Sequence, residues 1–362
     1  MQMPTSKICG ESSHTGFAGL PHWHQDDHSA AFAAFVCSAR EMLARPYRHV
    51  SSDFDQDALR RCCERAETQP DLSRDQARAF FEENFCLVDL EGPGFVTGYF
   101  EPLMEASPVQ TKDFCVPLYC RPPELVDIDD SNRPSDMDQD CRFGQIKDNR
   151  LVEYFDRGAI QAGALAGRNL ELVWLKDKTD AYFIHIQGSA KLVFPDQTIV
   201  RISFSAKSGH AYSSLAKHLS AKQGTDEQLM TADRLADWMR SNPDEIDAFM
   251  AHNRSYIFFR IIENISESDG PVGAARIPLI KGRSLAVDRL LHTFGVPIWV
   301  RTKEPLPDQE NPFHRLMIAH DTGSAIVGPS RGDIFLGTGP EAGFMAGQVR
   351  HDAQMTLLVP RQ

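Results

Sequence analysis

The sequence predicts an α+β fold that is mainly β and begins with a helical region. Three observations support this prediction. Apolar residues recur at helical spacing in the N-terminal part, the spacing changes to short β-rich runs from residue 86, and short strands separated by Gly and Pro fill the chain from Ser255 onward. A chain of 362 residues is long enough for two or three domains of roughly 150 residues each.

Two N-terminal segments are expected to be helical. Residues 28–45 carry apolar side chains at helical spacing after the start signal Asp26–Asp27, and residues 54–84 repeat the pattern with charges on the opposite face. The run CLVDLEGPGFVTGYFEPLMEA, residues 86–106, predicts strands joined by tight turns, because Gly and Pro interrupt its β-rich stretches.

The middle of the chain is expected to pass from loop to strand to helix. Residues 121–149 are polar, acidic and Pro-containing, which predicts a long surface loop. Residues 171–206 predict strands with a hairpin turn at Pro195–Asp196–Gln197. Residues 212–251 predict helix that is broken near Asn242–Pro243.

The strand-rich C-terminal part predicts a small barrel with one helix at residues 339–348. The order of helix, β, helix and β therefore suggests one β domain interrupted by another. Composition places the chain among ordinary globular proteins, with 42% hydrophobic and 24% charged residues. A net charge of -12 argues against nucleic-acid binding, which begins with a positive surface.

The cysteines do not show the spacing of a metal site. No C-x-x-C pair of the structural zinc type is present, so we expect no metal and interpret most cysteines as small apolar residues, with one or two disulfides left open for an oxidising compartment. The eight cysteines are Cys9, Cys37, Cys62, Cys63, Cys86, Cys115, Cys120 and Cys141.

Neither a secretory signal nor a membrane span is visible in the sequence. The N-terminal residues lack a basic start followed by an apolar run of about 7 to 15 residues. No segment approaches the roughly 20 apolar residues of a transmembrane helix. Composition leaves two alternatives open, a cytoplasmic protein or an export signal upstream of this sequence.

Common catalytic motifs are missing, and carboxylates remain as the candidates for chemistry. The sequence has no G-x-S-x-G elbow, P-loop, dinucleotide-binding G-x-G-x-x-G or H-E-x-x-H motif. Asp288, Asp321 and Asp333 lie at the ends of short apolar runs rich in glycine. A carboxyl group shielded by apolar neighbours near a second carboxylate has a raised pKa and can act as an acid. Turn capping is an equal alternative for Asp321, and a structural role is favoured for Asp288.

At these residues the chain resembles a known family. GRSLAVDRLLHTFGVPIWV, followed by MIAHDTGSAIVGPSRGDIFLGTGPEAGFMAGQVR, is similar to the three-aspartate domain of the membrane-bound lytic murein transglycosylase A family. The resemblance extends from about residue 17 to the end. Further blocks agree in the expected order: GYFEP (98–102), FIHIQGSAKLVF (183–194), SGHAYSS (208–214), NRSYIFFR (253–260) and GPVGAARIPLIKGRSLAVD (270–288).

The resemblance implies a double-psi β-barrel with a second, smaller β-barrel-like domain inserted into it and a groove between them. The barrel would comprise residues 1–104 and 245–362, and the insertion residues 105–244. The implied substrate is the glycan strand of peptidoglycan, cleaved without hydrolysis between N-acetylmuramic acid and N-acetylglucosamine to leave 1,6-anhydromuramoyl ends. Asp333, in RGDIFLG, would serve first as general acid and then as base, and Asp321 would tune it. The reaction needs no cofactor.

Five residues of the family blocks are predicted to bind substrate: Tyr99, Phe100, Gln187, Ser189 and Tyr256. Aromatic faces suit sugar rings, although Tyr and Phe in strands are more often core residues. The implied location is the periplasm or cell envelope, with cell-wall enzyme complexes as further partners. Two alternatives stay open, a non-catalytic glycan-binding barrel and a hydrolytic glycosidase that uses two aspartates.

Overall fold

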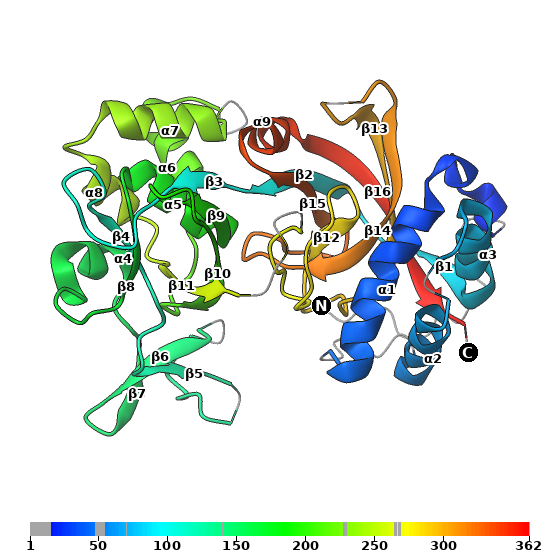
Figure 1. The fold of residues 1–362 in the computed structure, drawn as a ribbon, viewed down its shortest axis with the longest axis horizontal. Helices are drawn as coiled ribbons and strands as arrows, with labels where there is room; N and C mark the ends of the chain where they lie inside the picture. Colours follow the sequence, from blue (N-terminus) through cyan, green and yellow to red (C-terminus); the bar gives the residue numbers. More distant parts are fainter. Residues whose placement is uncertain are drawn as a thin grey trace. The chain divides into compact units, whose positions relative to one another are not determined.

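The computed structural model describes residues 16–47, 55–69, 71–129, 131–138, 141–226, 230–263, 266, 269–307 and 309–361. The chain divides into two units (Figure 1). The first unit comprises Met1–Phe100 and Ser266–Gln362, and the second comprises Glu101–Ile265. The second unit ends later than the expected boundary at residue 245, because β11 (Ile257–Ile262) pairs with β10 (Ile199–Lys207).

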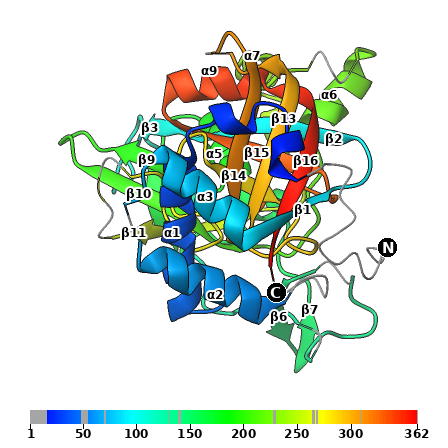
Figure 2. The same ribbon diagram turned by 90° about the vertical axis from the view of Figure 1, so that its right-hand side faces the viewer.

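Three helices form the N-terminal part of the first unit: α1 (His28–Ala44), α2 (Gln56–Glu67) and α3 (Arg74–Asn84). Asp27 caps α1 by accepting a hydrogen bond from the Ala30 N–H group, and Ser73 begins α3 with a capping box that includes Gln76. The Ser73 cap explains why the predicted helical region 54–84 contains two helices. α1 packs against α2, α3 and β14 (Pro312–Asp321), as Figure 2 shows for the three helices.

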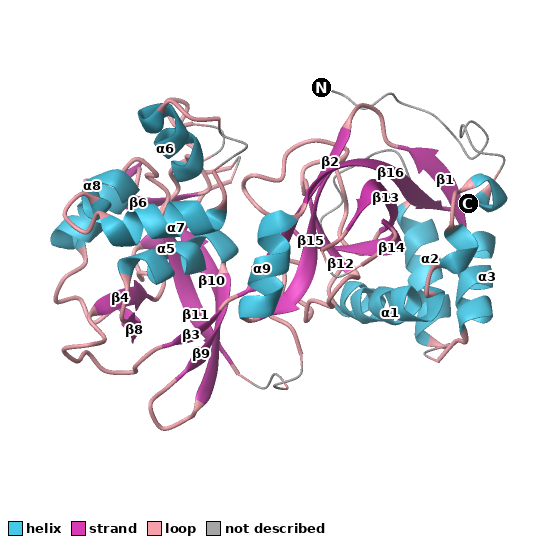
Figure 3. Ribbon diagram, turned by 90° about the horizontal axis from the view of Figure 1, so that it is seen from above, coloured by secondary structure: helices cyan, strands magenta, loops and turns pink. Residues whose placement is uncertain are grey.

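One sheet of the first unit closes on itself. Its strand order is β1-β16-β13-β14-β12-β15-β2, and β16 also pairs with β2. The strands from β16 through β2 therefore form a closed ring. The helix α9 (Pro340–Gln348) packs beside β15, one strand of this ring (Figure 3). The remaining bounds are β1 (Phe85–Asp89), β2 (Gly94–Glu101), β12 (Ser284–Val287), β13 (Pro297–Pro305), β15 (Arg331–Thr338) and β16 (Arg350–Pro360).

The core of the first unit joins the helices to the ring. Trp299 of β13 is fully buried and meets Trp23 in an edge-to-face contact at 5.0 Å between ring centroids. A buried ion pair reinforces this joint, because Arg283 donates through Nη1 to Asp26 Oδ2 at 2.8 Å and through Nη2 to Asp26 Oδ1 at 2.9 Å. Asp26 Oδ2 also accepts a hydrogen bond from the Leu316 N–H group. Asp26 thus holds the N-terminal segment against β14 and against the turn that precedes β12.

The second unit contains three small sheets with the orders β11-β10-β9-β3, β4-β8 and β5-β6-β7. Its other strands are β3 (Leu103–Glu105), β4 (Val116–Tyr119), β5 (Leu125–Asp127), β6 (Phe143–Lys147), β7 (Arg150–Val152), β8 (Glu171–Leu175) and β9 (Ser189–Val193). Its helices are α4 (Arg157–Ala159), the π-helical turn Ile160–Ala164, α5 (Lys178–Gln187), α6 (Leu215–Gln223), α7 (Ala232–Ser241) and α8 (Ile246–Met250).

Two local predictions for the second unit are wrong. Residues 178–187 form the helix α5 within the predicted strand region, because Asp177 caps its first N–H groups and Gly188 ends it in the left-handed conformation. Residues 121–149 include β5 and β6, so this segment is not all loop. The hairpin turn at residues 195–197 is confirmed, since β9 and β10 pair antiparallel on either side of it.

The prediction of a mainly β α+β fold with a helical N-terminal region is confirmed, and so is the helix near residues 339–348. The double-psi strand path and a groove between domains stay predictions. Cys86 is disulfide-bonded, six other described cysteines are free, and Cys9 lies outside the described residues. No group of three or more His, Cys, Asp or Glu residues in the described part could hold a metal ion.

Candidate active site

Asp333 lies in β15 and is half-buried. Thr97 of β2 donates a hydrogen bond from its hydroxyl to Asp333 Oδ1 at 2.6 Å. Burial raises the pKa of Asp333 to about 6, against the lowering effects of the Thr97 hydrogen bond and the Arg331 charge, while the Asp321 charge adds to the rise. Asp333 Oδ2 accepts no hydrogen bond from any described residue. One oxygen of this carboxyl group is therefore available for proton exchange.

Asp321 ends β14, and both of its carboxylate oxygens are engaged. The Tyr99 hydroxyl donates to Oδ2 at 3.0 Å, and the Ala274 N–H group donates to Oδ1 at 2.9 Å. Burial raises the pKa of Asp321, and these hydrogen bonds oppose the rise. The Asp321 carboxylate is thus fixed in place.

The sheet register brings the two aspartates to one place. Ala286 of β12 pairs with Asp321 of β14 on one side and with Asp333 of β15 on the other. Neighbouring strands lie about 4.8 Å apart, so the two aspartate backbones are roughly 10 Å apart across a single alanine. Thr97 and Tyr99 contact one aspartate each, because alternate residues of a strand share a face. The structure therefore brings Asp321 and Asp333 to neighbouring places and sets Tyr99 against Asp321, while the roles predicted for these three residues stay predictions.

Asp288 is buried but belongs to a turn. Its Oδ1 accepts from the Leu290 N–H group at 3.0 Å, and its Oδ2 accepts from the Gly328 N–H group at 2.8 Å. Both oxygens therefore hold backbone segments in place. This agrees with the structural role favoured for Asp288 from the sequence.

Sequence reasoning missed Thr97 and Arg331. Arg331 lies two residues before Asp333 in β15, and its Nη2 donates to the Thr97 hydroxyl oxygen at 2.7 Å. The guanidinium group also lies 5.5 Å from the centre of the Phe95 ring. The available signal was the alternation along each strand, which places Arg331 on the face of Asp333 and Thr97 on the face of Tyr99.

The other predicted substrate-binding residues have different surroundings. Phe100 packs closely on α9, where a Cβ atom at Gly343 would lie 2.8 Å from its ring. Gln187, Ser189 and Tyr256 belong to the second unit. Ser189 is buried, and Tyr256 is buried with an edge-to-face contact to His185 at 4.4 Å. Substrate binding by these four residues stays a prediction.

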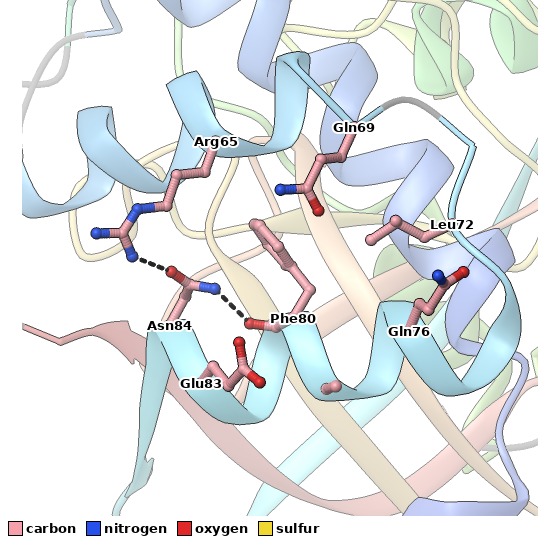
Figure 4. A pocket seen from close by; sticks show the side chains of 8 residues that line it. Arg65, Gln69, Leu72, Gln76, Phe80, Glu83 and Asn84 are labelled. Atoms are coloured by element: carbon pink, nitrogen blue, oxygen red, sulfur yellow. Dashed lines mark hydrogen bonds between the residues drawn. The ribbon is translucent and has the colours of Figure 1, made fainter.

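A surface pocket in the first unit lies away from these carboxylates. Figure 4 shows it between α2 and α3, with Arg65 donating to the side chain of Asn84. Its lining includes neither Asp321 nor Asp333, so we assign it no part in the site. The lining residues are Arg65, Gln69, Leu72, Gln76, Ala79, Phe80, Glu83 and Asn84.

Comparison with known proteins identifies the family. Residues 95–260 match the family model of the MltA specific insert domain, and residues 283–359 match that of the 3D domain. The crystal structure of a membrane-bound lytic murein transglycosylase from Agrobacterium tumefaciens is 42% identical, with a TM-score of 0.89 over 96% of this chain and 97% of that chain. The chain belongs to the membrane-bound lytic murein transglycosylase A family. The resemblance stated from the sequence is thereby confirmed.

Further members of the lytic murein transglycosylase A family give the same result. MltA from Neisseria gonorrhoeae is 28% identical, with a TM-score of 0.79 over 100% of this chain and 98% of that chain. Membrane-bound lytic murein transglycosylase A of Escherichia coli K12 is 29% identical over 270 residues, which are 72% of this chain and 64% of that protein. The chain therefore matches about two thirds of the length of this curated relative. None of the helices in the described ranges has the length and apolar character needed to span a membrane.

Proposed function

We propose that this protein is a lytic transglycosylase that cleaves glycan strands of peptidoglycan between N-acetylmuramic acid and N-acetylglucosamine, leaving 1,6-anhydromuramoyl ends. The names of its relatives support an enzyme of this class. The observation that carries the proposal is the asymmetry of the two aspartates. Asp333 has one oxygen open for proton exchange and a pKa of about 6, whereas both oxygens of Asp321 are engaged.

One carboxyl group is enough for this reaction. Protonated Asp333 donates its proton to the glycosidic oxygen, and the bond between that oxygen and the anomeric carbon breaks with its electron pair passing to the oxygen. The 6-hydroxyl group of the same muramoyl residue attacks the anomeric carbon, and Asp333 accepts the hydroxyl proton. The carboxyl group ends in its starting state, and the steps use neither water nor a cofactor.

The engaged oxygens of Asp321 argue against a two-aspartate hydrolase. A hydrolase needs a second carboxylate that attacks the sugar or activates water. Asp321 would have to break its hydrogen bond to Tyr99 or Ala274 to do either. We therefore assign Asp321 an electrostatic and positioning role beside Asp333.

Product analysis tests the proposed function. Digestion of purified sacculi is expected to release muropeptides with anhydro ends, identified by mass spectrometry from the mass of one missing water. Reducing muramic acid ends from the same digestion would show hydrolysis instead and would overturn the proposal. An Asp333→Asn preparation, purified in the same way, serves as the blank for contaminating hydrolases.

Activity is expected to fall as pH rises above about 6. The pKa of Asp333 is about 6, and the first step needs the protonated form, so kcat/KM should decline by about tenfold per pH unit on the alkaline side. Rates of sacculus solubilisation across a pH series measure this limb. Asp321→Asn removes a charge that raises the Asp333 pKa, and should therefore move the limb to lower pH. A limb that moves upward would contradict this assignment.

We further propose that the protein acts in the periplasm or cell envelope, where its substrate lies. The disulfide at Cys86 supports this location, because disulfides persist in oxidising compartments. Cell-wall enzyme complexes remain proposed partners. The catalytic and inserted domains that the resemblance implies also remain proposed, with the limits of the two units Met1–Phe100 with Ser266–Gln362 and Glu101–Ile265.

A further inference from the structure

A chain of hydrogen bonds leads from Arg331 through Thr97 to Asp333. Arg331 Nη2 lies 2.7 Å from Thr97 Oγ1, which in turn lies 2.6 Å from Asp333 Oδ1. A guanidinium group can only donate hydrogen bonds, whereas a hydroxyl group both donates and accepts. Thr97 Oγ1 therefore accepts from Arg331, and its own hydrogen points to Asp333 Oδ1. The direction of the chain is fixed by the arginine.

We propose that Thr97 and Arg331 are positioning residues that reserve Oδ1 of Asp333 as a hydrogen-bond acceptor and so keep the exchangeable proton on Oδ2. This inference rests on the proposed function, because it names the oxygen of Asp333 that would face the glycosidic bond. A proton on Oδ1 would point at the hydroxyl hydrogen of Thr97, and the two hydrogens would repel each other. Oδ2 accepts no hydrogen bond from the described residues and is free to carry the proton.

The strands hold the arginine in this orientation. Arg331 Nη1 donates to the carbonyl oxygen of Gly332, and the guanidinium group lies against the Phe95 ring. Phe95 and Thr97 share one face of β2, and Arg331 and Asp333 share one face of β15, because side chains alternate along a strand. The two strands are neighbours in the sheet. The chain of hydrogen bonds is thus set by backbone pairing.

Loss of either residue has a definite consequence for the proton. Without Arg331, the Thr97 hydroxyl can rotate and accept a hydrogen bond from protonated Asp333, which places the proton on the wrong oxygen. Without the Thr97 hydroxyl, Oδ1 becomes a second protonation site. The charged and titratable groups that face Asp333 are Arg331 from its own strand, Asp321 from β14 and Tyr99 from β2. Burial raises the pKa of Tyr99, and the charges of the two aspartates add to the rise.

The experiment compares Thr97→Val and Thr97→Ser with a matched control, Thr356→Val. Thr356 of β16 is buried and, like Thr97, donates to an aspartate, Asp89 Oδ1 at 2.8 Å, but no hydrogen bond joins it to Asp333. Two quantities are measured for each variant: kcat and KM on sacculi, and the pKa of Asp333 from a carbon-13 NMR titration of its carboxyl group. The titration does not depend on turnover.

Thr97→Val is expected to raise the Asp333 pKa and to lower kcat by about 10- to 100-fold, with KM within about twofold of the original protein. Thr97→Ser keeps the donor and should restore kcat to within about threefold. Thr356→Val should leave the Asp333 pKa unchanged and kcat within about threefold of the original protein. A change found only in the Thr97 variants then comes from the lost hydrogen bond to Asp333 and not from general destabilisation.

Arg331→Met provides an independent second variant. It retains the Thr97 hydroxyl but removes both its direction and a nearby positive charge, so the Asp333 pKa should rise and kcat should fall with KM little changed. If Thr97→Val does not fold, Arg331→Met alone tests the proposed positioning role. An unchanged pKa and kcat in folded Thr97→Val or Arg331→Met overturns the inference. Hydrolytic products from the unchanged protein would instead overturn the proposed function, while the titration would still report on the hydrogen bond.

Discussion

Replacing Asp333 with Asn is expected to lower kcat on sacculi by about 10³-fold, because an amide can neither donate the proton to the glycosidic oxygen nor take one from the 6-hydroxyl group. Asn has nearly the same shape as Asp and can still accept the Thr97 hydrogen bond through its side-chain oxygen. The loss should therefore appear in kcat with little change in KM. Release of soluble muropeptides, followed by chromatography, measures it.

The same variant separates an enzyme from a non-catalytic barrel. If the protein only binds glycan, the original protein and Asp333→Asn should sediment equally with sacculi, and neither should release muropeptides. If Asp333→Asn keeps full turnover, another group supplies the proton and the assignment fails. Asp352→Asn, at an exposed position of β16, provides the control for a change of charge in the same unit.

Replacing Asp26 with Ala is expected to lower the free energy of unfolding by about 3–5 kcal/mol. The change leaves the buried Arg283 guanidinium group without its carboxylate and removes the acceptor of the Leu316 N–H group. The largest part of the loss comes from the unpaired buried cation. Urea unfolding followed by tryptophan fluorescence measures the change, since Trp23 and Trp299 meet in the same core.

Two further variants serve as controls for the stability prediction. Asp71→Ala changes an exposed aspartate of the same unit and should alter the free energy of unfolding by less than about 0.5 kcal/mol. The double change of Asp26→Ala with Arg283→Met removes both charges and should recover part of the loss, because no buried cation remains. Equal stability of Asp26→Ala and the unchanged protein would show that the ion pair contributes nothing.

Local sequence patterns predicted most of the elements of the first unit. Alternation and glycine turns predicted the C-terminal strands, and helical spacing predicted α1 to α3. The pattern failed at α5, because TDAYFIHI alternates like a strand while Asp177 and Gly188 supply helix ends. It also missed β5 and β6, whose short apolar runs are hidden among acidic residues. In these segments the tertiary surroundings determined the secondary structure, and the local sequence pattern does not report those surroundings.

The candidate site was predictable only in part. Asp321, Asp333 and Tyr99 were named from sequence blocks, and the structure connects them through a hydrogen bond and a shared register. Thr97 and Arg331 were missed because their roles depend on which strand lies beside which. Thr97 and Asp333 are separated by 236 positions, and no spacing rule within the chain relates them.

The closure of the ring by β16 and β2 has a consequence for biosynthesis. β2 precedes β16 along the chain, so Arg350 can pair with Thr97 only after the intervening strands have been synthesised. Contacts of such long range form late in folding. A nascent chain that stops before β15 therefore lacks Asp333, and the Thr97 hydroxyl of β2 has no carboxylate to which it can donate; the proposed proton donor and its hydrogen bond are assembled only after β15 has been made.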